Sequence, residues 1–218
     1  MKSQSLKTIY YGTIARATVL NFLWRRFFPL QPRSGRVILH LGCGRNYLPL
    51  PGFVNIDGNL FVPKDLWLDI TLGLPYTDGC IDAVYSNHVL EHLSEKGVRR
   101  VLQESFRVLK PGGGIRLVTP HLGKAIEAYR AGNMEFFGDW PDARKSIGGK
   151  FNNYLLCRNQ HRLMFDQSFL EEMLRNAGWV HIREAGPLES SIFSRKDLTE
   201  MGGEAPDAHR SLIIEALK

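Results

Sequence analysis

Short apolar runs alternate with amphipathic stretches along the chain from residue 36 onward. The apolar runs predict strands at Arg36–Leu41, Phe53–Asp57, Ala83–Ser86, Gly114–Thr119, Trp179–Ala185 and Ser211–Leu217. Apolar residues at helical spacing predict helices over Val89–Leu93, extended by Ser94–Leu109, and over Gln167–Ala177. This alternation predicts an α/β fold, a doubly wound and mostly parallel sheet with helices on both faces.

Glycine and proline mark the boundaries of these elements. Gly178 is the expected C-cap of the helix over Gln167–Ala177, and Pro111 in "LKPGGG" should end a helix before the strand at Gly114. Residues 120–166 contain no clean strand and are rich in Gly, Asn, aromatics and Arg. A structureless loop of that length is unusual, so we expect a substrate lobe or lid with short helices, such as one in "GKAIEAYRAGN".

Residues 1–33 are expected to form a basic, aromatic helical arm ahead of a domain over residues 34–218. In "TIYYGTIARATVLNFLWRRFFPL" the aromatic and apolar positions recur at helical spacing, but the apolar run between Arg16 and Arg25 is too short to span a bilayer. No small-residue cleavage site of a signal peptide is evident. The pattern fits a helix packed on the domain, an interfacial helix at an anionic membrane, or a nucleic-acid arm.

Composition and charge narrow the class of protein. With 44% hydrophobic and 23% charged residues in 218, the chain has the make-up of a soluble globular protein. Three scattered cysteines without a CxxC pair favour the reducing cytoplasm over a disulfide scaffold or structural zinc. The net charge of +6 comes from the arm, since no Asp or Glu precedes Asp57. A nucleic-acid partner for the domain is therefore not expected.

The stretch "VILHLGCGRNYLPLPGFVNID" contains a glycine turn between two predicted strands. Gly42 and Gly44 begin a dinucleotide-like fingerprint, but Tyr47 stands where a third glycine belongs and the acid Asp57 comes early. Taken alone, the turn leaves open whether it binds a nucleotide or is simply tight.

Downstream motifs extend this pattern. "LGCG", "HVLEHL" and "RVLKPGG" together resemble the class I S-adenosylmethionine-dependent methyltransferases, specifically the methyltransferase-11-like group. "HRLMFDQSFLEEMLRNAGW" is similar to a segment of small methyltransferases found with polysaccharide and lipopolysaccharide biosynthesis enzymes. The resemblance implies a seven-stranded Rossmann-like sheet and S-adenosylmethionine as cofactor, with S-adenosylhomocysteine as product.

The resemblance also implies which residues hold the cofactor. The backbone of the turn would approach the methionine portion, Asp57 would hold the ribose, and Asp69 and Ile70 would flank the adenine. Asn87 and His88 would border the cofactor near the sulfonium. His40 departs from the acid that many relatives have. The full implied set is His40, Leu41, Gly42, Cys43, Gly44, Asp57, Gly58, Asp69, Ile70, Asn87 and His88.

Methyl transfer to a hydroxyl needs a base near neutral pH, and histidine is the natural choice. His121, which follows a predicted strand, and His161 are the candidate catalytic residues. His121 could instead bind substrate, and His161 could pack structurally with Asp166. We expect no metal site, because "HVLEH" is not the HExxH pattern, and we expect His92 to be a buried hydrogen-bonding group.

The predicted function is methyl transfer from S-adenosylmethionine to a small-molecule or glycan acceptor, with a hydroxyl as the expected site of methylation. The chain lacks the (D/N)PP(Y/F) motif of amide or adenine nitrogen methylation. The arm would be explained by peripheral contact with the inner face of a membrane. The sequence leaves the oligomeric state open. The alternatives are a nicotinamide-dependent reductase and a catalytically silent cofactor-binding partner that docks through its arm.

Overall fold

A single seven-stranded sheet organises the chain in the computed structural model, which describes residues 17, 19–24, 27, 29–30, 35–201 and 204–218. The spatial order is β3-β2-β1-β4-β5-β7-β6. The strands are β1 (Ile38–Leu41), β2 (Phe53–Asp57), β3 (Leu66–Trp67), β4 (Ile81–Asn87), β5 (Leu109–Pro120), β6 (Val180–Glu184) and β7 (Ser211–Leu217). The first five are parallel, whereas β7 runs antiparallel to both β5 and β6. The predicted fold class is confirmed.

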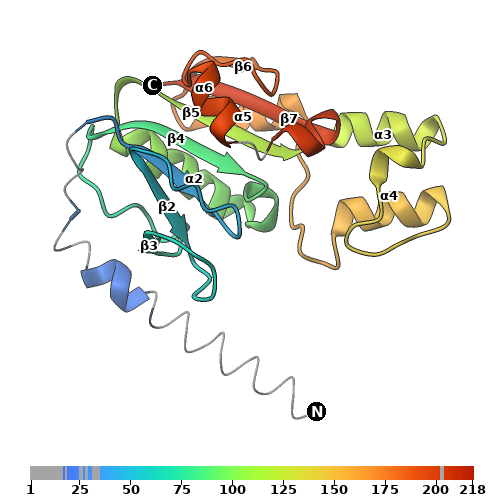
Figure 1. Cartoon of the computed structure of the whole chain (residues 1–218), viewed down its shortest axis with the longest axis horizontal. Coiled ribbons are helices and arrows are strands. Elements are labelled where there is room, and N and C mark those ends of the chain that lie inside the picture. The colour runs from blue at the N-terminus through green and yellow to red at the C-terminus, as the bar shows by residue number, and fades with distance from the viewer. Residues whose placement is uncertain (1–16, 18, 25–26, 28, 31–34, 202–203) are drawn as a thin grey trace, which may run out of the picture.

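Both faces of the sheet are covered, as the ribbon in Figure 1 shows. On β1, Leu39 and Leu41 point into the larger core cluster, which includes buried residues of α2 (Glu95–Val108) and α5 (Gln167–Asn176). Ile38 joins a smaller cluster with residues of α6 (Arg195–Met201). The alternation follows from the two-residue period of a strand that is buried on both sides.

The two largest differences between predicted and observed boundaries lie at α2 and β5. The helix expected from Val89 is interrupted: a 3-10 turn, η1 (Leu90–His92), is followed by extended Leu93, and α2 begins after Ser94. Ser94 caps α2 by accepting a hydrogen bond from the Gly97 amide, an N-cap signal present in the sequence. Strand β5 begins at Leu109, five residues earlier than predicted, because Pro111 is accommodated near the start of the strand.

Residues 120–166 form a lobe at the carboxyl end of β5, which projects at the right of Figure 1. Its elements are α3 (Leu122–Arg130), the 3-10 turn η2 (Glu135–Phe137) and α4 (Ile147–Leu156). The lobe has a small core of its own around Ala125, Ala128 and Phe137. The expectation of short helices and no long strand in this region is confirmed.

The described part of the N-terminal arm contacts the β3 edge of the sheet. Asn21 Nδ2 donates to the Trp67 carbonyl at 2.6 Å, and Phe22 packs against the larger core cluster. Leu20 and Phe27 remain 68% and 78% exposed. Residues 1–16, on which much of the helical prediction rests, lie outside the described residues. No helix in the described ranges is long and apolar enough to cross a bilayer.

Candidate active site

The glycine turn and Asp57 lie together at the carboxyl ends of β1 and β2. Gly42 and Gly44 both have positive φ, 64° and 53°, which explains why glycine occupies each position. The Gly44 amide donates to Asp57 Oδ2 at 2.7 Å, and the Asn59 amide donates to Asp57 Oδ1 at 2.6 Å. The half-buried carboxylate is therefore held rigidly at the strand end, where ligands of such sheets bind.

This arrangement fits the sugar of a nucleoside. Each carboxylate oxygen has two acceptor positions, so Asp57 keeps acceptor capacity for two ribose hydroxyls after its two backbone bonds. A Cβ on Gly44 would have no atom closer than 4.0 Å, so its open side is available to a ligand that approaches the backbone. Leu41 and Cys43 are buried beside the turn, and Gly58 follows Asp57 at the same edge.

His40 is placed away from this opening, inside the sheet. Its side chain is 2% exposed, and Nδ1 lies 2.9 Å from Asn55 Oδ1. Burial lowers the pKa of His40, so the imidazole is neutral. The Asn55 amide group also bonds the Leu48 backbone and Asp65. His40 thus supports the loop behind the glycine turn through Asn55.

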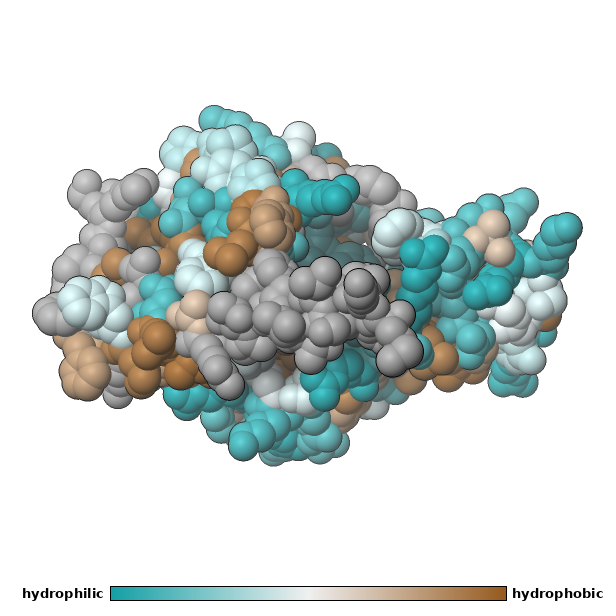
Figure 2. Space-filling model, turned by 90° about the horizontal axis from the view of Figure 1, so that it is seen from below, coloured by the Kyte–Doolittle hydropathy of each residue, from teal (hydrophilic) through white to brown (hydrophobic). Residues whose placement is uncertain are grey.

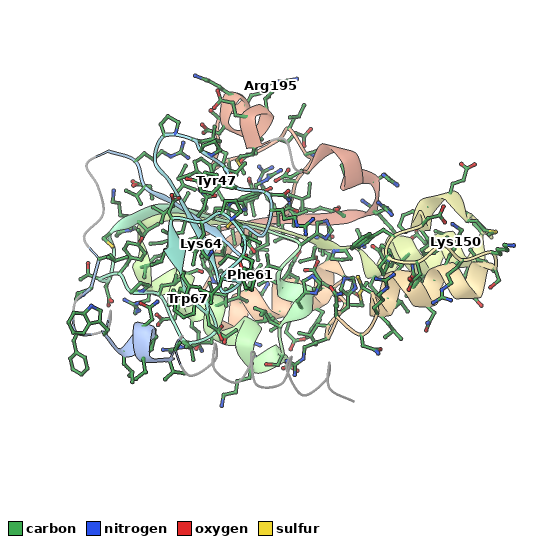
Figure 3. The ribbon with its side chains drawn as sticks, turned by 60° about the horizontal axis from the view of Figure 1, so that its bottom comes forward. Tyr47, Phe61, Lys64, Trp67, Lys150 and Arg195 are labelled. Carbon is green, nitrogen blue, oxygen red and sulfur yellow. The ribbon has the colours of Figure 1, made fainter. Side chains whose placement is uncertain are left out.

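Two loops meet over the carboxyl ends of β1 and β2. The Tyr47 hydroxyl donates to Asp65 Oδ1 at 2.9 Å, and Figure 3 shows Tyr47, Phe61 and Lys64 gathered in this region. Tyr47 occupies the place of the third glycine of a dinucleotide fingerprint. Its contact with Asp65 shows that this position joins two loops rather than beginning a crossover helix.

Asp69 and Ile70 differ in their surroundings. Asp69 Oδ1 accepts bonds from the Thr71 amide and hydroxyl at 2.9 and 2.7 Å, and the residue lines an open cavity of about 520 Å³. Ile70 is 6% exposed and belongs to the larger core cluster. The structure therefore places Asp69 at a ligand-accessible surface and gives Ile70 a supporting position beneath it.

The end of β4 carries a histidine–carboxylate pair. His88, which follows Asn87, has a positive φ of 52°, uncommon for a residue other than glycine. Its Nδ1 lies 3.1 Å from Glu91 Oε1, and its Nε2 lies 3.3 Å from Ser211 Oγ. Because the carboxylate can only accept, His88 carries its proton on Nδ1 when neutral, and its Nε2 lone pair accepts from the Ser211 hydroxyl.

A cavity of about 340 Å³ opens between this pair and the lobe. Its polar wall includes His88, Glu91, His92 and His161, and its aromatic wall includes Trp140. The other lining residues are Pro120, Phe137, Pro141, Asn153, Tyr154, Cys157, Gln160 and Arg210. A mostly apolar cavity with a few convergent polar groups is typical of a small-molecule site.

Of the two predicted catalytic histidines, His161 lines this cavity, and burial lowers its pKa. His121 caps α3, where its Nδ1 accepts from the Lys124 amide at 3.4 Å, and it is not among the lining residues. Glu91 is fully buried at the cavity wall. The acid between the two histidines of "HVLEH" was visible in the sequence, but its burial against this cavity was not.

Two arginines of the segment after α4 lie in different surroundings. Arg158 forms an ion pair with Asp142 on the exposed surface of the lobe. Arg162 lines the cavity beside Asp69, and its backbone amide donates to the Glu91 carbonyl at 2.7 Å. Arg162 therefore lies beside the cavity that Asp69 lines, whereas Arg158 lies on the surface of the lobe.

Comparison with known proteins finds methyltransferases. A family model described as "Methyltransferase domain" matches residues 65–117. The chain is 27% identical over 169 residues to a ubiquinone/menaquinone biosynthesis C-methyltransferase UbiE of Hydrogenovibrio crunogenus, which covers 72% of the chain and 61% of the relative. It is 27% identical over 115 residues to the protein of that name from Salmonella paratyphi B, covering 50% and 43%. The chain thus spans about half the length of these relatives.

Solved structures share the fold. An S-adenosylmethionine-dependent methyltransferase of Archaeoglobus fulgidus superposes with a TM-score of 0.53 and 14% identity, covering 96% of this chain and 100% of that one. A phosphoethanolamine N-methyltransferase 2 of Haemonchus contortus, in complex with S-adenosyl-L-methionine, gives 0.51 and 16%, covering 91% and 51%. The chain therefore matches a methyltransferase-domain model over residues 65–117 and shares the fold of solved S-adenosylmethionine-dependent methyltransferases.

Proposed function

We propose that the chain transfers the methyl group of S-adenosylmethionine to a hydroxyl of a small-molecule or glycan acceptor bound in the 340 Å³ cavity. The observation that carries the proposal is the His88–Glu91 pair, which places a basic nitrogen on the cavity wall at the carboxyl end of β4. S-adenosylmethionine, when bound, supplies an electrophilic methyl group on its sulfonium.

The cofactor would be held by the edge formed by β1, β2 and β4. Asp57 accepts from the ribose hydroxyls, the Gly42–Gly44 backbone faces the methionine portion, and Asp69 lies beside the cavity suited to the base. Asn87 and His88, which end β4, border the methyl-donating end. His40 contributes indirectly, since it supports the turn through Asn55.

The cavity supports a ring-shaped acceptor with hydroxyl groups. Trp140 is 74% exposed at its wall and offers a flat apolar surface to one face of a sugar or aromatic ring. Asn153 and Gln160 supply amide groups, and Arg210 supplies a guanidinium. Positioning of two reactants accounts for a large part of catalysis in such a displacement.

His88 is the proposed general base. Its Nε2 lone pair takes the hydroxyl proton, while Glu91 Oε1 holds Nδ1 and stabilises the imidazolium that forms. The acceptor oxygen then bonds to the methyl carbon, and the electron pair of the broken carbon–sulfur bond remains on sulfur. A positioned base of this kind contributes roughly 10²–10⁴-fold in rate.

The relatives named as C-methyltransferases favour a second candidate, methyl transfer to an activated ring carbon. The same base would remove a proton from the phenol-type hydroxyl that activates such a ring. The aromatic wall of the cavity suits this acceptor as well. Product analysis distinguishes an O-methyl ether from a ring C-methyl group.

The test compares wild type with His88→Asn, because asparagine tolerates positive φ and cannot act as a base. Transfer of radiolabelled methyl to a panel of methyl glycosides, phenols and quinols is measured alongside calorimetric binding of S-adenosylmethionine. We expect transfer to fall about 10²-fold or more with cofactor affinity retained. His181→Asn is the matched control, since exposed His181 also has a positive φ of 49°. Unchanged transfer in His88→Asn would refute the role.

The proposal includes a cytoplasmic location with peripheral membrane contact through the arm. It is supported by Leu20, Trp24 and Phe27, which expose between 66% and 78% of their surface. Figure 2 shows hydrophobic surface at the lower left of the molecule seen from below. Flotation with anionic liposomes should recover the wild type but not a Leu20→Ser/Trp24→Ser/Phe27→Ser variant. Equal recovery of both would exclude this contact.

A further inference from the structure

We propose that Glu91, His92 and His161 bind a divalent transition-metal ion, with Zn²⁺ the best-matched probe, on the wall of the acceptor cavity. One ligand atom from each residue lies within 4.8 Å of the others. Two imidazoles and one carboxylate are the protein ligands of many catalytic zinc sites. The role of the ion rests on the proposed function, whereas its binding can be measured without it.

Glu91 provides the evidence that a cation is needed. Its side chain is 0% exposed, and Oε2 has no hydrogen-bond partner among the described residues. Its ion-pair partners in the same part of the chain are His88 and His92, both of which carry charge only when protonated. A buried carboxylate is costly unless it is paired with a cation or binds a metal.

Both histidines present the correct nitrogen. His92 Nδ1 lies 3.1 Å from the Gln160 carbonyl, and His161 Nδ1 lies 3.2 Å from the Leu155 carbonyl. A carbonyl only accepts hydrogen bonds, so Nδ1 carries the proton in each ring and Nε2 keeps a free lone pair. Metal-ligating histidines commonly donate their other N–H to a backbone carbonyl in this way.

The backbone keeps the third ligand next to the other two. The amides of Arg162 and Leu163 donate to the Glu91 carbonyl at 2.7 and 3.2 Å, so the segment that carries His161 is tied to η1. The rings of His92 and His161 have centroids 5.1 Å apart. The motif "HVLEH" contains only two of the three ligands, Glu91 and His92. The third, His161, comes from a segment far along the chain, so the cluster was not evident from the sequence.

Metal binding requires only a small closure. With metal–ligand distances of about 2.0–2.2 Å in a tetrahedral site, donor atoms lie roughly 3.3 Å apart. The largest separation of 4.8 Å must therefore shrink by about 1.5 Å, which rotation of the two half-exposed imidazoles can supply. Three protein ligands leave a coordination position open to the cavity.

An ion at this position would make the acceptor hydroxyl more acidic. A divalent cation that accepts the hydroxyl oxygen as its fourth ligand stabilises the negative charge left on that oxygen when the proton leaves for His88 Nε2. Glu91 would then serve both groups, since its Oε1 lies 3.1 Å from His88 Nδ1 and 4.0 Å from His92 Nε2, and its Oε2 makes no hydrogen bond to the described residues. The acceptor oxygen bonds to the methyl carbon as it would without the ion, and the electron pair of the carbon–sulfur bond stays on sulfur. No further reactant is needed.

The experiment measures metal binding directly. EDTA-treated, dialysed protein is titrated with ZnCl₂ by calorimetry, and Co²⁺ loading is followed by its visible absorption, which is intense for tetrahedral nitrogen and oxygen ligands. We expect one ion per chain for wild type and His181→Asn. Each of the three residues supplies one of the proposed metal ligands. The His161→Ala and Glu91→Gln variants should therefore each bind Zn²⁺ at least about 10-fold more weakly than wild type.

The outcomes separate this inference from the proposed function. Absence of one-to-one binding, or equal binding by wild type, His161→Ala and Glu91→Gln, overturns the metal site. If the wild type does not bind Zn²⁺ one-to-one but still transfers methyl after EDTA treatment, the proposed function stands without the ion. If Zn²⁺ binds through these residues but no acceptor is methylated, the site stands and the proposed function fails.

Discussion

Gly42→Ala tests whether the turn at the end of β1 is as closely packed as the structure indicates. A Cβ at residue 42 would lie 2.5 Å from Val89 Cγ2 and 2.7 Å from Val89 Cγ1, far inside van der Waals contact. The φ of 64° adds a second penalty, because a left-handed backbone costs an alanine about 1–2 kcal/mol. Overpacking against a β-branched side chain adds roughly 1–3 kcal/mol. The free energy of unfolding should therefore fall by about 2–5 kcal/mol.

Gly79→Ala is the matched control for the backbone penalty. Gly79 has a φ of 66°, and a Cβ there would have no neighbour within 4 Å. Its substitution should cost only the conformational part, about 1–2 kcal/mol. The difference between the two variants isolates the collision with Val89, which connects the glycine turn to the segment that carries His88 and Glu91.

Urea unfolding followed by circular dichroism gives both free energies, and a Val89→Ala background completes a double-mutant cycle. In that background Gly42→Ala should lose most of its steric cost, leaving a coupling energy of about 1–3 kcal/mol. The reasoning is refuted if Gly42→Ala costs no more than Gly79→Ala, or if Val89→Ala leaves the cost of Gly42→Ala unchanged.

Three further predictions concern buried charge, pH and the cofactor. Arg116→Met should destabilise the chain by about 3–5 kcal/mol in urea unfolding, because fully buried Arg116 pairs with Glu204 and Glu215 at 2.7 Å. Burial lowers the pKa of His40, so as the pH falls below 6.5 this histidine becomes protonated in the unfolded chain before it does in the native state. The free energy of unfolding should fall below pH 6.5 by up to about 1.4 kcal/mol per pH unit from this group, and His40→Gln should show a shallower slope. Asp57→Asn should weaken calorimetric binding of S-adenosylmethionine about 10- to 150-fold, and unchanged affinity would remove Asp57 from the cofactor site.

The fold was largely predictable because its signals are local. Buried parallel strands are apolar throughout, so β1 and β2 were recognised from their own residues, and Asp166 and Ser94 mark helix starts by side-chain caps. β3 was missed because two residues, Leu66 and Trp67, carry no detectable period. Its formation depends on pairing with β2, a tertiary effect that no local pattern records.

The candidate site was only partly predictable. The residues expected to bind the cofactor cluster in sequence around two strand ends, and the structure brings Gly44 and Asp57 into direct contact. The acceptor side depends on contacts between distant segments, so the sequence could only name His121 and His161 together as catalytic candidates. The structure places His121 as the cap of α3 and His161 on the cavity wall. Helix capping by a histidine ring is not distinguishable from catalysis in a sequence alone.

The antiparallel strand explains how so many polar groups reach one edge of the sheet. In a purely parallel sheet only residues that end strands lie at the carboxyl edge. β7 runs in the opposite direction, and its first residue, Ser211, pairs in register with Pro120, the last of β5. Ser211 therefore reaches His88 from the start of a strand, and Arg210 just before it lines the acceptor cavity. Reversal of one strand thus adds a second source of site residues, and it does so on the acceptor side, next to the base and away from the glycine turn.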